Sequence, residues 1–192
     1  MNLNLDYYLR KYDGFLSNNE CDQVLEEIEK KDWKKHNFYG PETGKFAHSF
    51  EFDNLFDLSG DLNSSKKINE RVYNCFQQYV KETSDEFASF GIGNSSYVRY
   101  NRYKVGQAMS PHCDHILTLF MEDNRGPKGI PILSMIGALN DNFEGGEFIM
   151  WQERIIPIPK GSVIIFPSIF LYPHHVEFVK KGTRYSFVSW AW

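Results

Sequence analysis

The sequence YKVGQAMSPHCD, at residues 103–114, ends in a His-x-Asp pair formed by His112 and Asp114. The segment before it, Tyr97–Tyr103, is rich in aromatic and β-branched residues, which predicts a strand. Side chains two residues apart on a strand point to the same face, so an imidazole and a carboxylate would project side by side. The pair is therefore a candidate metal site that needs a third ligand from elsewhere in the chain.

Further metal-ligating and anion-binding residues occur later in the chain. The histidines that follow His115 are His174 and His175. A His-x-Asp pair and one distant histidine form the facial triad of non-heme Fe(II) enzymes, which leaves three coordination positions open for a chelating cosubstrate and O2. Arg184 follows nine or ten residues later, and on a strand it would share a face with Ser186. A guanidinium group beside a hydroxyl suits a buried carboxylate, because the planar fork binds it in bidentate fashion.

Length, composition and charge exclude several classes of protein. The 192 residues favour one domain with a sizeable core. The composition is 42% hydrophobic and 16% aromatic, which excludes a disordered chain. The net charge is −4 without a basic tract, so we expect no nucleic-acid partner. Because no apolar run has membrane-spanning length and the first residues lack a basic and apolar leader, we expect neither a membrane protein nor a signal peptide.

The cysteines indicate the redox compartment. Cys21, Cys75 and Cys113 are few, odd in number and far apart in the sequence. This pattern disfavours a disulfide framework and favours a reducing compartment, so we expect a cytoplasmic protein.

The first half of the chain predicts two helices. Ser17-Asn-Asn-Glu20 is a capping-box pattern, and after it apolar residues recur every three or four positions. We expect this helix to end near Lys31–Trp33. A second helix is expected to follow Ser64 and to end near Phe87–Gly91, where glycines stop it. A short strand is expected at Tyr7–Phe15.

The second half predicts strands separated by turn residues. We expect strands at Tyr97–Tyr103, Ile116–Met121, Pro131–Asn140, Glu147–Trp151, Ile155–Ile158, Ser162–Phe166, Val176–Val179 and Thr183–Trp192. Two helices followed by about eight short strands predict an α+β fold: a double-stranded β-helix (jelly-roll) core with two supporting N-terminal helices. We expect residues 1–192 to form one domain, in which 1–95 give mainly helical support and 96–192 form the β core with the metal site.

Several motifs occur in a fixed order along residues 97–192. They are Tyr103-x-x-Gly106, His112-x-Asp114, Leu139-Asn-Asp-Asn-Phe143-Glu-Gly145-Gly146-Glu147, Pro159-Lys-Gly161-Ser162-Val-Ile-Ile-Phe166 and His174-His-Val176-Glu-Phe178-Val179-Lys-Lys-Gly182-Thr-Arg184. In order and spacing they resemble the motifs of the Fe(II)/2-oxoglutarate-dependent dioxygenases, in the prolyl 4-hydroxylase-like branch. Two positions depart from that pattern: Met109 stands where the family often has an aromatic residue, and Phe178 replaces the usual proline.

The resemblance implies a ligand set for iron. His112, Asp114 and His174 would bind Fe(II). His174 fits the family's His-x-Val motif and lies ten residues before Arg184. A spacing of nine residues, found in the oxygen-sensing branch, would select His175 instead, so both histidines remain candidates.

The resemblance also implies a site for the cosubstrate. Arg184 would bind the distal carboxylate of 2-oxoglutarate, with Ser186 and Tyr103 helping. Fe(II), 2-oxoglutarate and O2 are the implied cofactor and cosubstrates, and ascorbate is a further candidate. The strand Tyr97–Tyr103, including Arg99 and Asn101, would line one wall of the pocket.

The implied reaction is the hydroxylation of an unactivated C–H bond, coupled to the decarboxylation of 2-oxoglutarate to succinate and CO2. The first expectation for the substrate is a prolyl residue in a peptide or protein. Alternatives are the hydroxylation of a free amino acid or other small molecule, a cupin-like binding module without turnover, and a structural zinc site. Zinc sites more often use cysteine or a third histidine and need no arginine clamp. The oligomeric state stays open, and segments 37–44 and 123–129 are candidate lids.

Overall fold

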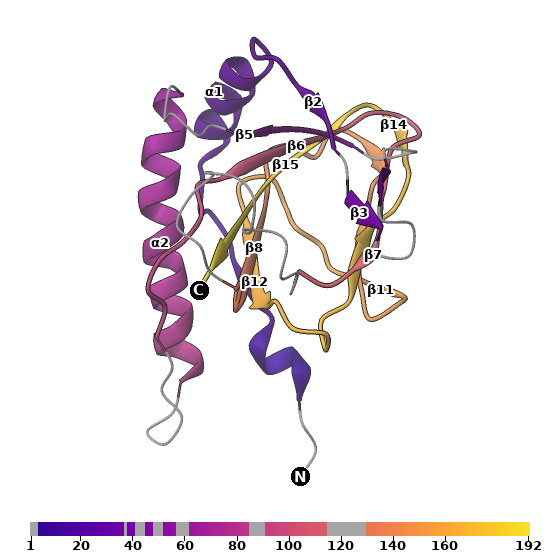
Figure 1. Cartoon of the computed structure of the whole chain (residues 1–192). Helices are drawn as coiled ribbons and strands as arrows, with labels where there is room; N and C mark the ends of the chain where they lie inside the picture. The colour runs from indigo at the N-terminus through magenta and orange to yellow at the C-terminus, as the bar shows by residue number, and fades with distance from the viewer. Residues whose placement is uncertain are drawn as a thin grey trace.

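The computed structural model describes residues 4–36, 38–40, 45–47, 52–56, 62–84, 91–114 and 130–192. Two helices lie along one side of a set of antiparallel strands (Figure 1). Some positions of interest lie outside the described residues. They are the predicted strand Ile116–Met121, the loop 123–129, most of segment 37–44, and the two histidines His48 and His115. Within the described part of the chain, no helix is both long enough and apolar enough to cross a membrane.

The start of helix α1 (Asn18–Ile28) confirms the predicted capping box. The Ser17 hydroxyl accepts a hydrogen bond from the backbone N–H of Glu20, and the Glu20 carboxylate accepts one from the backbone N–H of Ser17. The predicted end at Lys31–Trp33 is wrong, because the helix ends at Ile28. The Trp33 indole folds back and donates a hydrogen bond to the Ile28 carbonyl over 3.0 Å. The Ile28 carbonyl also accepts a hydrogen bond from the backbone N–H of Lys31, so a final turn and a side chain together satisfy it.

Helix α2 (Asn63–Thr83) is the longer of the two and packs against α1. Its apolar face is buried, as the periodicity predicted, and includes Ile68, Val72, Cys75 and Phe76. The helix ends at Thr83 because Ser84 adopts an extended conformation (φ −79°, ψ 144°), so the predicted end at 87–91 is several residues too late.

The first strand was predicted only in part. The segment from Tyr7 to Phe15 contains strand β1 (Arg10–Tyr12). Its first two residues, however, belong to a 3-10 helix, η1 (Leu5–Tyr8). The Asn4 side chain accepts a hydrogen bond from the backbone N–H of Asp6 and caps this short helix.

In the described part of the chain, seven strands form the larger sheet. Its order is β1, β12 (Val163–Pro167), β8 (Leu133–Ala138), β15 (Arg184–Ala191), β6 (Arg99–Tyr103), β5 (Asp53–Phe56) and β2 (Lys34–Lys35). All the pairings are antiparallel. The segment before residue 96 therefore contributes three strands to this sheet, in addition to the two helices.

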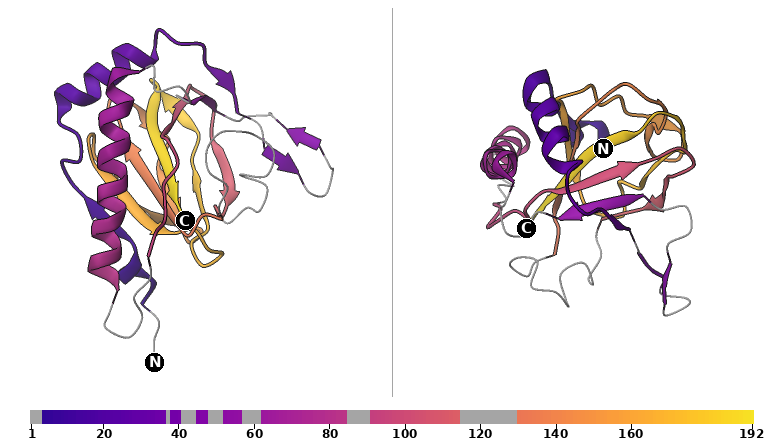
Figure 2. Two further views of the ribbon diagram at one scale, coloured as in Figure 1. Left: turned by 60° about the vertical axis from the view of Figure 1, so that its left-hand side comes forward. Right: turned by 90° about the horizontal axis from the view of Figure 1, so that it is seen from above.

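A smaller four-stranded sheet faces the larger one. Its order is β11 (Arg154–Ile155), β10 (Phe148–Met150), β13 (His174–Val176) and β7 (Met109–His112). Two further pairs are β9 (Glu144–Gly145) with β14 (Val179–Lys181), and β3 (Phe38–Gly40) with β4 (Lys45–Ala47). The β3–β4 hairpin extends away from the sheets in the left view of Figure 2.

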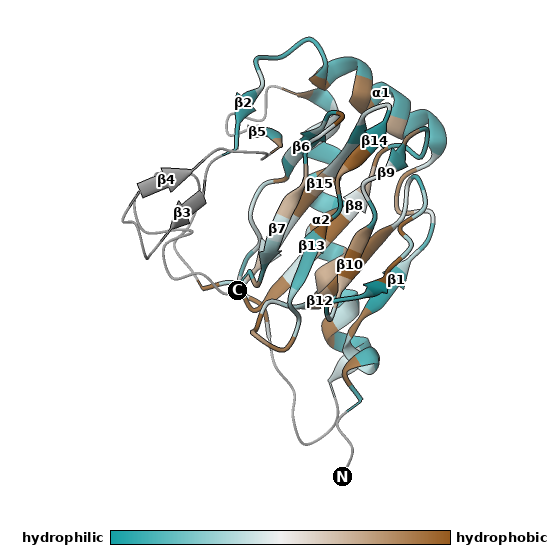
Figure 3. Ribbon diagram, turned by 90° about the vertical axis from the view of Figure 1, so that its right-hand side faces the viewer, coloured by the Kyte–Doolittle hydropathy of each residue, from teal (hydrophilic) through white to brown (hydrophobic). Residues whose placement is uncertain are grey.

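Two apolar clusters fill the space on either side of the larger sheet. The first joins α1 and α2 to the sheet, and the second lies between the two sheets. On β12, Val163 and Ile165 belong to the first cluster, while Ile164 and Phe166 belong to the second. Alternate side chains of one strand point to opposite faces, which explains why this strand is apolar throughout. The hydropathy colouring in Figure 3 shows brown segments along the core strands and bands of brown among teal on α1.

These layers match the predicted α+β fold with a double-stranded β-helix core and two supporting N-terminal helices. Helices cover the outer face of the larger sheet (Figure 2, right), and the second apolar cluster lies between the sheets. In the smaller sheet, β7 carries His112 and the neighbouring β13 carries His174, so the predicted metal site lies where the two sheets face each other.

Candidate metal centre

The His-x-Asp pair and a distant histidine meet on the smaller sheet. Strands β7 and β13 pair so that His112 lies directly opposite His174, and Asp114 follows two residues after the end of β7. His112 Nε2 lies 3.3 Å from Asp114 Oδ1, and His174 Nε2 lies 3.8 Å from Asp114 Oδ2. One ligand atom from each of the three residues lies within 4.8 Å of the others. The convergence predicted from the sequence is therefore present.

The structure selects between the two neighbouring histidines. His174 is 2% exposed and its ring faces Asp114, whereas the His175 imidazole Nε2 lies 3.2 Å from Glu177 Oε1. Neighbouring side chains of a strand point to opposite faces, so only one of the two can reach the pair. The geometry brings His174, and not His175, to the candidate site.

Backbone carbonyl groups orient both imidazole rings. His112 Nδ1 lies 2.8 Å from the Ser110 carbonyl oxygen, and His174 Nδ1 lies 3.0 Å from that of Tyr172. A carbonyl can only accept, so each Nδ1 carries a proton, and in the neutral form of each ring Nε2 keeps its lone pair. Metal-ligating histidines are commonly held in this way. Both Nε2 atoms are thus ready to bind a cation.

The Asp114 carboxylate is also held by a neighbour that the sequence analysis missed. Ser134 of β8 donates a hydrogen bond from its hydroxyl to Asp114 Oδ2 over 2.7 Å. The Ser134 hydroxyl lies 2.7 Å from that of Ser168, and both serines are about 1% exposed. A serine in the otherwise apolar segment Leu133–Ala138 was the signal that could have identified this contact, since a buried hydroxyl needs a partner.

The protonation states of Asp114 and His174 suit metal binding. Burial favours the neutral acid, but the neighbouring His174 and His112 and the hydrogen bond from Ser134 outweigh it and lower the pKa of Asp114. Burial, together with the nearby His112, lowers the pKa of His174 to about 4. Near neutral pH the aspartate is therefore ionised and His174 is neutral. Two imidazole nitrogens and one carboxylate oxygen on one face fit the donor set of non-heme Fe(II).

The predicted carboxylate clamp lines the same pocket. Arg184 is 5% exposed, and its Nη1 donates a hydrogen bond to the Ser186 hydroxyl over 2.9 Å. Tyr103 on β6 pairs directly with Arg184 on β15, and the guanidinium carbon lies 5.0 Å from the centre of the tyrosine ring. Burial lowers the pKa of Arg184 from its usual value. The geometry leaves a buried guanidinium group beside the metal ligands.

The rest of the pocket wall comes from both sheets. Arg99 and Asn101 line it together with Tyr103, as expected for the strand 97–103, whereas Tyr97 precedes β6, is 54% exposed and does not line it. Phe52 also lines the pocket and stacks on Tyr103, with ring centres 4.5 Å apart. No local pattern in the sequence could have identified Phe52, because its place depends on how β5 pairs with β6.

Comparisons with known proteins agree with this geometry. A sequence model of the 2OG-Fe(II) oxygenase superfamily matches residues 98–192. A PKHD-type hydroxylase of Thermosynechococcus vestitus is 38% identical over 97 residues, which cover 48% of this chain and 41% of that protein. The chain spans about two fifths of the length of the curated relatives that it matches.

Solved structures share the fold over nearly the whole chain. The viral collagen prolyl hydroxylase of Paramecium Bursaria Chlorella virus-1, in complex with 2OG, has a TM-score of 0.68 at 20% identity, covering 96% of this chain and 94% of that one. A prolyl hydroxylase of Trichoplax adhaerens, in complex with a hypoxia inducible factor peptide fragment, has a TM-score of 0.69 at 14% identity, covering 97% and 84%. Through its residues 98–192, which hold the His112, Asp114 and His174 cluster, the chain belongs to the 2OG-Fe(II) oxygenase superfamily.

Proposed function

We propose that the protein is an Fe(II)- and 2-oxoglutarate-dependent dioxygenase that hydroxylates an unactivated C–H bond. The observation that carries this proposal is the convergence of His112, Asp114 and His174 beside the buried guanidinium of Arg184. A metal-ligand triad and a carboxylate clamp in one pocket match the two ends of a 2-oxo diacid. A structural zinc site or a binding module without turnover would need only one of these two features.

Each residue of the site has a defined task in this proposal. The iron would be held by His112, Asp114 and His174. When bound, it would activate O2 in a reaction coupled to the decarboxylation of 2-oxoglutarate to succinate and CO2. Arg184 and the Ser186 hydroxyl bind the distal carboxylate of 2-oxoglutarate and fix its orientation. The aromatic and aliphatic walls exclude water, which strengthens these charged contacts.

For the substrate, we propose a prolyl residue in a peptide or protein. The similar solved structures include a collagen prolyl hydroxylase and a prolyl hydroxylase bound to a peptide fragment, and the similar sequences include PKHD-type hydroxylases. A free amino acid or other small molecule would use the same chemistry. Ascorbate is proposed as an accessory reductant. The free thiols of Cys21, Cys75 and Cys113 support the proposal of a reducing, cytoplasmic environment.

Succinate formation from 2-oxoglutarate, with Fe(II) and O2, tests the proposed activity. We expect slow turnover without a substrate, stimulation by a proline-containing peptide, and a loss of at least about 100-fold in His112→Ala and Arg184→Ala, because each removes a contact that holds the reacting groups. His175→Ala is the matched control, since this histidine faces away from the site. Equal turnover in His112→Ala and the wild type would contradict the proposal.

A further inference from the structure

Four residues form a row across neighbouring segments of the larger sheet. Arg184 of β15 lies directly opposite Tyr103 of β6. Strand β5 pairs with β6 in a register that, continued by one residue, places Phe52 opposite Tyr103. On the far side of Phe52, the backbone N–H of His36 donates a hydrogen bond to the Phe52 carbonyl oxygen over 2.8 Å. The row therefore runs from the carboxylate clamp into the first half of the chain.

Ring contacts follow the same row. The Phe52 ring stacks on the Tyr103 ring, with centres 4.5 Å apart and planes inclined by 28°. It also stacks on the His36 ring, with centres 4.4 Å apart and planes inclined by 12°. Two rings this close and nearly parallel to a third cannot share one of its faces, so Phe52 is held between Tyr103 and His36. At the other end of the row, the Arg184 guanidinium carbon lies 5.0 Å from the centre of the Tyr103 ring.

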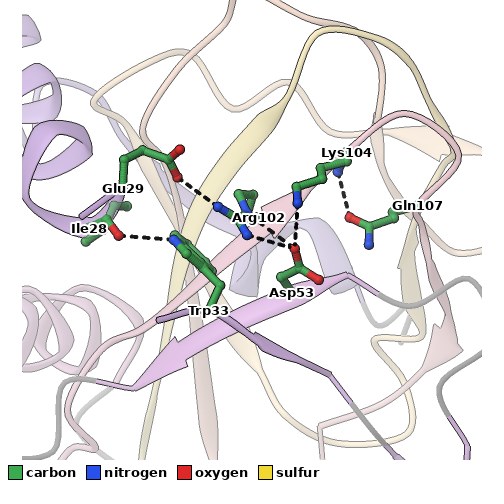
Figure 4. Close-up of polar contacts among 7 residues, drawn as sticks. All are labelled: Ile28, Glu29, Trp33, Asp53, Arg102, Lys104 and Gln107. Atoms are coloured by element: carbon green, nitrogen blue, oxygen red, sulfur yellow. Dashed lines mark hydrogen bonds and ion pairs between the residues drawn. The ribbon is translucent and has the colours of Figure 1, made fainter. Parts of the chain in front are cut away.

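The position of Phe52 is fixed by its surroundings. Its side chain is 1% exposed and belongs to the apolar cluster between the two sheets. The next residue, Asp53, accepts hydrogen bonds from the Arg102 guanidinium (Figure 4), which hold the start of β5 against β6. His36 Nδ1 lies 3.0 Å from Asn54 Nδ2, so the outer ring of the row is held as well. In a close-packed interior, a side chain held in this way is a rigid support for its neighbours.

Tyr103 transmits this support to the clamp. Its ring is buried, with Arg184 on the β15 side and Phe52 on the β5 side. An aromatic face attracts a guanidinium group and restricts its rotation. A ligand binds more tightly to groups that are oriented in advance, because less conformational freedom is lost on binding. Without Phe52, the Tyr103 ring could tilt away and the guanidinium would lose the surface that orients it.

We propose that Phe52 is a positioning residue for the cosubstrate: through Tyr103 it orients the Arg184 guanidinium and so raises the affinity for 2-oxoglutarate. This inference rests on the proposed function and adds a residue to its site. Phe52 and His36 lie outside residues 98–192, the part of the chain that matches the superfamily model. The first half of the chain thus contributes to the cosubstrate pocket and not only to the support of the sheet.

Calorimetric titration of the Mn(II)-loaded protein with 2-oxoglutarate tests the inference. Phe52→Leu keeps an apolar side chain but removes the ring. We expect it to raise the Kd for 2-oxoglutarate about tenfold, the combined scale of one ring–ring contact and one guanidinium–ring contact. The Kd for Mn(II), measured without 2-oxoglutarate, stays at the wild-type value, because Phe52 is not one of the three candidate ligands. In succinate formation, the KM for 2-oxoglutarate rises while kcat at saturating 2-oxoglutarate is kept.

A double-mutant cycle shows whether Phe52 acts through Tyr103. In the Tyr103→Leu background, Phe52→Leu causes little further loss of 2-oxoglutarate affinity, because the ring on which Phe52 acts is already absent. If circular dichroism shows that Phe52→Leu does not fold, Phe52→Met takes its place in the cycle, because methionine adapts to irregular gaps in a core.

Phe76→Leu is the matched control for the loss of a buried aromatic ring. Phe76 of α2 is 0% exposed and belongs to the apolar cluster on the other side of the larger sheet. This variant loses a ring of the same size but none of the contacts in the row, so it keeps the wild-type Kd for 2-oxoglutarate.

The inference is overturned by an unchanged Kd for 2-oxoglutarate in the Phe52 variant, or by a loss that is equally large with and without the Tyr103 ring. It is also overturned by an equal loss in Phe76→Leu, or by a parallel loss of Mn(II) affinity, since Phe52 would then only maintain the shape of the pocket. A wild-type protein that binds Mn(II) but not 2-oxoglutarate would overturn the proposed function together with the inference, which distinguishes the two failures.

Discussion

At the scale of single residues, the metal site depends on a chain of two hydroxyl groups. The Ser134 hydroxyl has one hydrogen atom, which it donates to Asp114 Oδ2, so the hydrogen bond between the two serines must be donated by Ser168. Successive hydrogen bonds of this kind polarise and strengthen one another. The chain fixes the rotation of the carboxylate and leaves Asp114 Oδ1 facing His112.

We therefore predict that Ser134→Ala weakens metal binding by about 10- to 100-fold, which is the usual effect of removing a contact that orients a metal ligand. Titration of the metal-free protein with Mn(II), followed by calorimetry, measures the change in Kd. Ser189→Ala is the control, because Ser189 is equally buried on β15 and hydrogen-bonds to Ser96 and not to a ligand. An equal loss of affinity in both variants would mean that Ser134 acts only through the stability of the sheet.

The residues that could be predicted are those whose chemistry follows local spacing. His112, Asp114, Arg184 and Ser186 lie within short motifs, and the alternation of side chains along a strand was enough to predict which of them share a face. The same rule left His174 and His175 undecided, because the strand's inward face was unknown until it was paired. Ser134, Ser168 and Phe52 reach the site only through contacts between distant segments. A serine within an apolar strand hinted at a buried partner for Ser134, but no local pattern indicated which residue it would contact.

At the scale of secondary-structure elements, helix starts were easier to predict than helix ends. The capping box at Ser17 and Glu20 is encoded within four residues. The glycine pair Gly145-Gly146 is a local signal of the same kind, since both residues adopt positive φ angles (76° and 65°). The end of α1 at Ile28 has no such signal, because neither glycine nor proline lies between Ile28 and Trp33. Helices that end without a glycine or proline lack a comparable local signal.

The first turn of α1 is expected to respond to pH. The Arg71 guanidinium, together with hydrogen bonds from Ser17, lowers the pKa of Glu20 from 4.5 to about 2. Because the folded-state pKa is below the unfolded value, the stabilising effect of Glu20 is fully present above about pH 4.5 and is lost as the pH falls toward 2. The unfolding free energy of the wild type should therefore exceed that of Glu20→Gln above about pH 4.5, and this difference should become smaller as the pH falls from 4.5 toward 2.

Urea denaturation at a series of pH values between 2 and 7 measures this difference. Glu26→Gln, on the exposed face of the same helix, controls for the removal of one negative charge. A wild-type advantage over Glu20→Gln that stays constant with pH would show that the interaction with Arg71 does not contribute in solution.

The turn before β10 gives a second prediction for an element. A Cβ atom at Gly145 would lie 2.3 Å from the Phe178 carbonyl oxygen, whereas one at Gly14 would meet no atom within 4 Å. Both glycines have φ near +70°, so both alanine variants carry a similar backbone cost of about 1–2 kcal/mol. Only Gly145→Ala must also push β9 away from β14. We predict a clearly larger loss of unfolding free energy for Gly145→Ala than for Gly14→Ala in urea denaturation; equal losses would rule out the close approach.

At the scale of the whole molecule, the two halves of the chain share one sheet. Strand β5 extends the larger sheet beside β6, and Arg102 of β6 contacts both Asp53 of β5 and Glu29 at the end of α1 (Figure 4). The Arg102 guanidinium also lies over the ring of Trp33, at 4.5 Å. These contacts join residues 49 to 73 positions apart.

Because both halves of the chain contribute to one sheet, the strands that the first half adds were not predicted from the sequence. The α+β fold with its double-stranded β-helix core followed from helix periodicity and from the succession of short apolar strands. Strands β2 and β5 have only two and four residues, and they are strands because they pair with distant partners. Such short strands have no periodicity of their own, so residues 1–95 were expected to give mainly helical support.

The most direct test of the central claim is the binding of 2-oxoglutarate to the Fe(II)-loaded protein without oxygen, followed by the charge-transfer absorption of the chelate. The wild type, His174→Ala and His175→Ala are compared after circular dichroism has confirmed that each is folded. We predict that the wild type and His175→Ala develop the absorption and that His174→Ala does not, because only His174 faces Asp114. An absorption that is kept in His174→Ala and lost in His175→Ala would contradict the proposed metal centre.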